Sequence, residues 1–160
     1  MIDLGEMKYF LDIEVYQGTN GIFINQKKYA NEVFEKFRIG ACNGIRNLIA
    51  PGSKLSKEEE RAQVDGTLFK QIVKSLMYMT VTIPELIYSV CLISRFMSNP
   101  MKAHMLAAKR ILRYVQATTD FDILYKRNCT YELIAYIDND YARDLSDQKS
   151  TSGYAFMLSG

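Results

Sequence analysis

A group of four aspartates lies near the end of the chain, and the first, Asp138, follows an apolar run that alternates like a β-strand. A strand that ends in a carboxylate can present it to a metal ion. The spacing leaves two interpretations open, a metal ligand or a solvated aspartate that ends a strand. A calcium loop starting at Asp138 is excluded, because Ala142 and Arg143 stand where a further ligand and the turn glycine are required.

A second candidate is a stripe of basic residues on a helix predicted over residues 100–116. At about 100° per residue, Lys102, Lys109 and Arg113 fall on one side, with Arg110 beside them, and the apolar residues gather opposite. Such a stripe can contact the phosphates of a nucleic-acid duplex. A solvated helix face explains the same pattern equally well, so both interpretations stay open.

Other reactive side chains give weaker signals. His104, the only histidine, falls at the edge of the apolar face of that helix, where we expect a packed or partly exposed side chain. Ser150, Thr151 and Ser152 have no histidine near them in sequence, so a nucleophilic triad is not supported.

The elements that would position these residues can be predicted from periodicity. Residues 131–138 and 152–158 form two β-type runs, which predict a long-looped antiparallel hairpin carrying Asp138. Three helical patterns precede it: Asp65 can cap the first, Pro84 begins the second, and Asn99-Pro100 opens the third. A short strand is expected at residues 121–125.

The first part of the chain predicts a β-hairpin followed by a helix. Residues 9–17 alternate as one strand, and an Asn20-Gly21 turn leads into Ile22–Ile24. Asn25 can cap the helix that follows, and Gly40 is expected to end it. Periodicity then disappears over a stretch with three consecutive glutamates, which indicates a linker.

Composition restricts the class of protein. The chain has 160 residues and a net charge of +2, so any nucleic-acid surface must be a local patch. Three distant cysteines without a CxxC pair argue against a disulfide framework and a zinc site, and favour a reducing compartment. With neither a membrane-length apolar run nor a signal peptide in this sequence, we expect a soluble intracellular protein, with cytoplasm and nucleus both open.

Several short motifs, in order along nearly the whole chain, resemble the Pol polyprotein of copia-type LTR retrotransposons. The landmarks are Asp3–Leu11, Gln26–Tyr29, Pro51–Leu55, Ser94–Met97, Ala107–Tyr114 and Lys149–Tyr154. Their order and spacing carry the resemblance, since no single motif decides it.

The resemblance implies an α+β chain made of consecutive Pol segments. Residues 1–50 resemble the end of the reverse transcriptase palm and a thumb-like block, and residues 51–64 a linker. Residues 65–120 resemble a three-helix connection, and residues 121–160 the incomplete start of a ribonuclease H domain with its opening hairpin. The polymerase Tyr-x-Asp-Asp hairpin is absent, and further ribonuclease H carboxylates are expected beyond Gly160.

The resemblance also implies a role for the candidate residues. Asp138 matches the first ribonuclease H carboxylate, in the context Tyr136–Ala142, and would bind Mg²⁺ in a site that needs further carboxylates. The implied partners are an RNA:DNA hybrid or a template-primer duplex, and the rest of Pol. We therefore expect a fragment that is inactive alone. The alternatives are a nucleic-acid-binding module using the basic helix, or a metal-dependent nuclease assembled by oligomerisation.

Some positions depart from the family pattern. Asp12, Lys74 and Asp122 replace glycines, Leu48 replaces a proline, and Ile83 and Glu85 replace an arginine and an aspartate. Lys74 and Asp12 are expected to be the most awkward, because a charged side chain must find room and solvent where two backbones approach. Drift in an unselected copy is our hypothesis for these changes, and it predicts that reverting Asp12, Lys74 and Ile83 raises stability.

Overall fold

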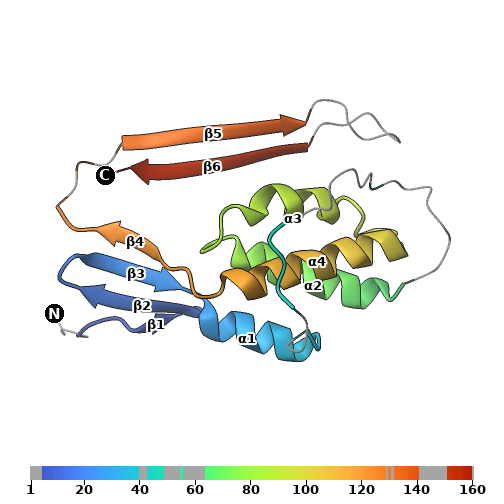
Figure 1. The fold of residues 1–160 in the computed structure, drawn as a ribbon, viewed down its shortest axis with the longest axis horizontal. Helices are drawn as coiled ribbons and strands as arrows, with labels where there is room; N and C mark the ends of the chain where they lie inside the picture. Colours follow the sequence, from blue (N-terminus) through green and yellow to red (C-terminus); the bar gives the residue numbers. More distant parts are fainter. Residues whose placement is uncertain are drawn as a thin grey trace.

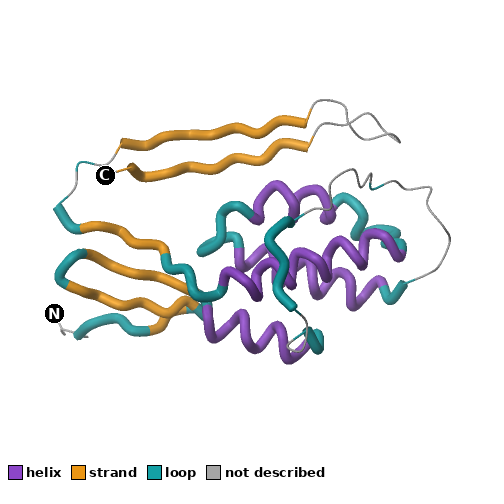
Figure 2. Tube along the Cα trace, viewed as in Figure 1, coloured by secondary structure: helices purple, strands orange, loops and turns teal. Residues whose placement is uncertain are grey.

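The computed structural model describes residues 5–39, 43–48, 55, 64–128, 130, 132–140 and 151–159. These residues form four helices and antiparallel strands in two sheets, so the predicted α+β class is confirmed (Figures 1 and 2). For residues 138–140, 151–153, 155, 158 and 159 the structure describes the backbone alone. No helix in the described part of the chain is long and apolar enough to cross a membrane.

The first sheet has the strand order β1-β2-β3-β4: Tyr9–Phe10, Ile13–Gly18, Gly21–Asn25 and Ile123–Lys126. The predicted β2–β3 hairpin is confirmed, but Gly21 is the first residue of β3 rather than part of the loop. Gly21 has φ +151°, and a Cβ there would lie 2.1 Å from the Tyr125 carbonyl oxygen on β4. Glycine is therefore required by the close approach of a third strand.

The prediction of one continuous strand over residues 9–17 was wrong. Leu11 and Asp12 adopt left-handed conformations, with φ of 46° and 57°, and they turn the chain so that Phe10 pairs with Ile13. The Tyr78 hydroxyl on the second helix donates to the Leu11 carbonyl oxygen, which holds this turn against the helices. A period-2 pattern cannot reveal such a turn, because a two-residue hairpin preserves the alternation.

Helix α1 spans Lys27–Lys36 and packs Ala30, Val33 and Phe34 into the core. The N-cap is Gln26, not Asn25 as predicted, and Gln26 makes no side-chain capping hydrogen bond. Asn25 lies one residue earlier, where its side chain accepts from the Lys27 N–H at 3.2 Å. The helix ends at Arg38, whose φ is 55°, with the Ile39 N–H donating to the Phe34 carbonyl at 2.9 Å. Arg38 takes the left-handed position of a Schellman motif, the place that Gly40 was expected to hold; Gly40 itself lies outside the described residues.

The three predicted helices are present as α2 (Gly66–Met79), α3 (Leu86–Ser94) and α4 (Lys102–Thr118). Asp65 caps α2 as predicted, since its carboxylate accepts from the Thr67 and Leu68 N–H groups at 2.9 and 3.1 Å. Their apolar faces meet in one core. Its largest fully buried apolar side chains are Phe69, Ile72, Leu76, Met79, Leu86, Ile93, Ile111 and Leu112.

The terminal hairpin is present as β5 (Glu132–Asp140) and β6 (Thr151–Ser159), paired from Glu132 and Ser159 to Asp140 and Thr151. It forms a separate two-stranded sheet, and β6 lies beside α3 (Figure 1). The family resemblance predicts that the strand at residues 121–125 belongs to this terminal unit. In the structure it is β4, and it pairs with β3 in the first sheet. The resemblance of this hairpin to a ribonuclease H fold stays a prediction.

Candidate nucleic-acid interface

Helix α4 separates a buried apolar face from an exposed one, as predicted. Met105, Ala108, Ile111, Leu112 and Val115 are buried. Lys102 and Lys109 are exposed, and Arg110 and Arg113 are half-buried.

The start of α4 is fixed by the single histidine. His104 is fully buried, its ring stacks on Phe96 with 3.8 Å between ring centroids, and its Nδ1 accepts from the Met101 N–H at 3.0 Å. The packed, structural role expected for His104 is therefore confirmed. The histidine sets where the helix begins and hence which residues form its outer face.

Residues 43–48, which we call the strap, run across α4 (Figure 1). The Arg113 Nε and Nη2 donate to the Asn43 carbonyl oxygen at 3.0 and 2.9 Å, and the Arg110 Nε donates to the Asn47 carbonyl oxygen at 3.1 Å. In return, the Ile45 N–H donates to the Arg113 carbonyl oxygen at 3.3 Å. The basic stripe is thus divided into two exposed lysines and two arginines that bind the strap.

Asp138 lies near the end of β5, where its Cα pairs with that of Gly153 on β6. Its side chain and residues 141–150 are outside the described part of the structure. Among the residues that are described, no group of three or more His, Cys, Asp or Glu could hold a metal ion. The described residues therefore supply no metal centre, and the assignment of Mg²⁺ to Asp138 stays a prediction.

The chain is similar to transposon proteins along almost all of its length. It is 35% identical over 156 residues to the retrovirus-related Pol polyprotein from transposon RE1 of Arabidopsis thaliana, covering 98% of this chain and 11% of that protein. It is 34% identical to the Pol polyprotein from transposon TNT 1-94 of Nicotiana tabacum, covering all of this chain and 13% of the relative.

Over nearly its whole length the chain is homologous to copia-type Pol polyproteins from transposons. It spans about one tenth of the transposon polyproteins that it matches. It is also 31% identical to an uncharacterized mitochondrial protein of Arabidopsis thaliana, AtMg00810, and covers 65% of it. No family model and no solved structure matches the chain.

Within this Pol family, the departure at Asp12 falls at a left-handed turn position. A glycine adopts φ +57° without strain, whereas an aspartate adopts it at some cost and is tolerated because its short side chain can bond locally. Asp12 does so, since its carboxylate accepts from the Tyr9 hydroxyl at 2.9 Å. The physical reason for glycine here is backbone conformation, not the close approach that the sequence suggested.

The other departures in this Pol segment find ordinary surroundings. Lys74 is exposed on α2, so the expected conflict over room is absent. Ile83 packs against the core. Glu85 accepts from the Tyr114 hydroxyl at 3.4 Å, and burial, followed by this carboxylate, raises the pKa of Tyr114. Asp122 accepts from the Asn25 amide at 2.9 Å.

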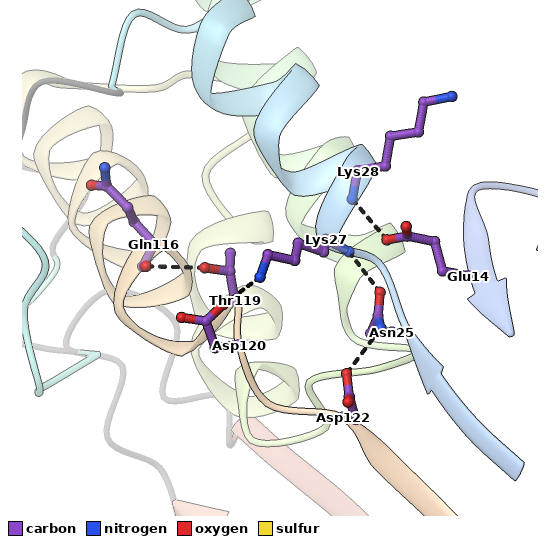
Figure 3. A network of polar contacts seen from close by, with 8 residues as sticks. All are labelled: Glu14, Asn25, Lys27, Lys28, Gln116, Thr119, Asp120 and Asp122. Carbon is purple, nitrogen blue, oxygen red and sulfur yellow. Dashed lines mark hydrogen bonds and ion pairs between the residues drawn. The ribbon is translucent and has the colours of Figure 1, made fainter. Parts of the chain in front are cut away.

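A polar network that joins α1, the first sheet and the end of α4 was missed by the sequence analysis (Figure 3). The Lys27 ammonium contacts the Asp120 carboxylate at 2.5 Å, and this hydrogen bond, together with the charge of Asp120, raises the pKa of Lys27. The Lys28 N–H donates to the Glu14 carboxylate at 3.0 Å. Carboxylates beside the start of α1 complement its positive end. The network is structural, and the only signal for it was the strand β4 that brings Asp120 and Asp122 back to β3.

Proposed function

We propose that this chain is the segment of a copia-type Pol polyprotein that links the end of reverse transcriptase to the start of ribonuclease H. The observation that carries the proposal is the match to transposon Pol polyproteins over 98% of the chain. The antiparallel β5–β6 hairpin with Asp138 near the end of β5 is consistent with a ribonuclease H opening hairpin, as the motif suggests. Residues 1–50, 65–120 and 121–160 would then be the palm and thumb-like block, the connection, and the incomplete nuclease.

In this role, α4 contacts the phosphates of an RNA:DNA hybrid or template-primer duplex. Lys102 and Lys109 are exposed on one helix whose opposite face is buried, so their position relative to the rest of the chain is fixed. Each phosphate that a lysine neutralises releases a counterion, so binding should weaken as salt rises.

The test is a salt titration of binding to a 16-base-pair RNA:DNA hybrid. In a Lys102→Gln, Lys109→Gln double variant, the slope of log K against log salt should fall by about 1.8, which is about 0.9 for each lost phosphate contact. A Lys28→Gln, Lys36→Gln variant removes the same charge from the exposed side of α1 and is the matched control. Equal slopes in the two variants would show that α4 is not the interface.

We propose that the chain alone has neither family activity, RNA-directed DNA synthesis or cleavage of RNA in hybrids. Its sequence contains no Tyr-x-Asp-Asp motif, and no group of three or more His, Cys, Asp or Glu among the described residues could hold a metal ion. The expected result is no nucleotide incorporation and no hybrid cleavage in Mg²⁺. Mg²⁺-dependent cleavage that Asp138→Asn abolishes and Glu132→Gln preserves would instead support a nuclease assembled by oligomerisation.

A further inference from the structure

We propose that the strap and the phosphates of a bound duplex compete for Arg110 and Arg113, so that the strap masks half of the basic face of α4. This inference rests on the proposed function, since it concerns the same helix. It adds a regulated state to that surface. In the strapped state Lys102 and Lys109 face solvent alone, and in the unstrapped state all four cations are available.

The edge of Arg113 that the strap occupies is one that phosphate prefers. Side-on binding of a phosphate uses two parallel N–H groups of the guanidinium fork. In Arg113 the Nε–Nη2 pair already donates to the single carbonyl oxygen of Asn43, at 3.0 and 2.9 Å. In Arg110 the Nε alone donates to the strap, to the Asn47 carbonyl oxygen at 3.1 Å. Neither arginine can bind a phosphate side-on through Nε until the strap moves.

A phosphate is the stronger competitor for these donors. The strap offers neutral carbonyl oxygens, which leave the guanidinium charge uncompensated. The guanidinium is a charged donor in both cases, but only a phosphate oxygen adds the Coulomb attraction between opposite charges. Exchange of a carbonyl for a phosphate oxygen therefore favours the unstrapped state when a duplex is present.

The strap itself is weakly held elsewhere. Asn43, Gly44, Arg46 and Asn47 are exposed, and its apolar contacts come from the half-buried Ile45 and Leu48. Leu48 packs against the core, but no strap residue is fully buried, so lifting the strap breaks the apolar contacts of two half-buried side chains. Local openings with few buried contacts lie at the low end of the free energies of unfolding within a protein.

Gly44 controls how closely the strap approaches α4. A Cβ at Gly44 would lie 2.8 Å from the Cβ of Ala117, which is too close, so any side chain there must push the strap from the helix. Two substitutions at this contact should push the strap away from α4. Gly44→Val enlarges the side chain on the strap, and Ala117→Leu enlarges the one on the helix; we call these two variants the wedges.

The wedges should strengthen binding of the RNA:DNA hybrid by on the order of tenfold, which corresponds to about one charge-assisted hydrogen bond regained. The salt slope should steepen by about 1.8 as two further phosphate contacts form. Gly66→Val is the matched control, because a Cβ at Gly66 meets Pro100 at 3.6 Å, an ordinary contact. Circular dichroism of each variant confirms that the helices are retained.

The lock is a disulfide between Gly44→Cys and Ala117→Cys, made with the three native cysteines replaced by serine. A disulfide needs Cβ atoms about 3.8 Å apart, so the strap must shift by about 1 Å while remaining on the helix. The oxidised form should bind the hybrid more weakly than the same sample after reduction. If the wedges strengthen hybrid binding and the disulfide weakens it, the strap masks Arg110 and Arg113.

The outcomes separate this inference from the proposed function. If the parent binds through Lys102 and Lys109 but wedge and lock leave its affinity unchanged, or the wedge weakens it, masking is wrong and the proposed function stands. Weak binding by the parent with strong binding by the wedge supports both. If neither form binds the hybrid at low salt, both are overturned.

Discussion

The helical unit and the terminal hairpin bury their apolar side chains to very different extents. In the helical unit Phe69, Leu76 and Leu112 have no exposed surface, whereas in the hairpin Ile137 is 68% exposed and Phe156 is 65% exposed. Both regions have the sequence pattern of a folded protein. The difference teaches that local pattern specifies an element, and that stability needs a second layer against which the element can pack.

Exposed apolar residues lie on both faces of the hairpin, with Tyr136 and Met157 on the face opposite to that of Ile137 and Phe156. The register pairs Ala135 with Phe156 and Ile137 with Tyr154, and side chains of directly opposed residues lie on the same face. All four of these residues with described side chains, together with Leu133, are outside the core. The hairpin therefore leaves apolar side chains uncovered.

Hydrogen exchange should show the largest difference between the two regions. A two-stranded hairpin is marginally stable in water, so amides of β5 and β6 should exchange through local opening, at least a hundredfold faster than those of α2 and α4. The contact between β6 and α3 provides some protection, which should favour β6 over the outer strand β5. If the amides of β5 and β6 exchange as slowly as those of α2 and α4, the two regions do not differ in stability as expected.

Truncating one side chain in each region should give the next largest effect. Leu112→Ala leaves a cavity in the closed core and should lower the free energy of unfolding by about 3 kcal/mol. Phe156→Ala removes a larger side chain that is already mostly in solvent, so the change should stay below about 1 kcal/mol. Urea unfolding followed by circular dichroism measures both. Comparable losses would mean that the face of Phe156 is covered in solution.

The sequence predicts the elements that local periodicity and capping specify, but not the contacts between distant parts of the chain. The four helices, the Asp65 cap and the β5–β6 pairing follow from periodicity and capping, which are local properties. The pairing of β4 with β3 joins residues about 100 apart in sequence, and nothing in either strand specifies its partner. The same holds for the strap, because no local pattern indicates that Arg113 will bind the carbonyl of Asn43.

Reversion of the two unusual glycine replacements should give opposite effects of about 1 kcal/mol or less. Lys74→Gly places glycine inside an exposed helix and should lower stability by about 1 kcal/mol. Asp12→Gly relieves a left-handed aspartate and should raise stability by less than about 1 kcal/mol, since it also removes the Tyr9 hydrogen bond.

A combined reversion would hide these opposing changes, so it is a poor test of drift. Thermal melts of the two single variants provide the measurement. A gain from Lys74→Gly would contradict the exposed position of this side chain and restore the drift hypothesis at α2.

The smallest effect concerns the turn that docks β1 against the helical unit. The Tyr9 hydroxyl donates to the Asp12 carboxylate, and this hydrogen bond, with smaller contributions from burial and from the charge of Asp12, raises the pKa of Tyr9 to about 12. Asp12→Asn removes the charge and should return the pKa toward the ordinary value of about 10. Nuclear magnetic resonance of the Tyr9 ring carbons follows the titration in each form.

The sign of the linked stability follows from that shift. Because the pKa of folded Tyr9 lies above its unfolded value, the hydrogen bond contributes fully below about pH 10 and is lost as the pH rises toward 12. The stability difference between parent and Asp12→Asn should therefore narrow across this window. The turn is also held by Tyr78 on α2, so it should open with the helical unit and not with the hairpin. A Tyr9 titration that is unchanged in Asp12→Asn would show that the Asp12 carboxylate is not what raises the pKa of Tyr9.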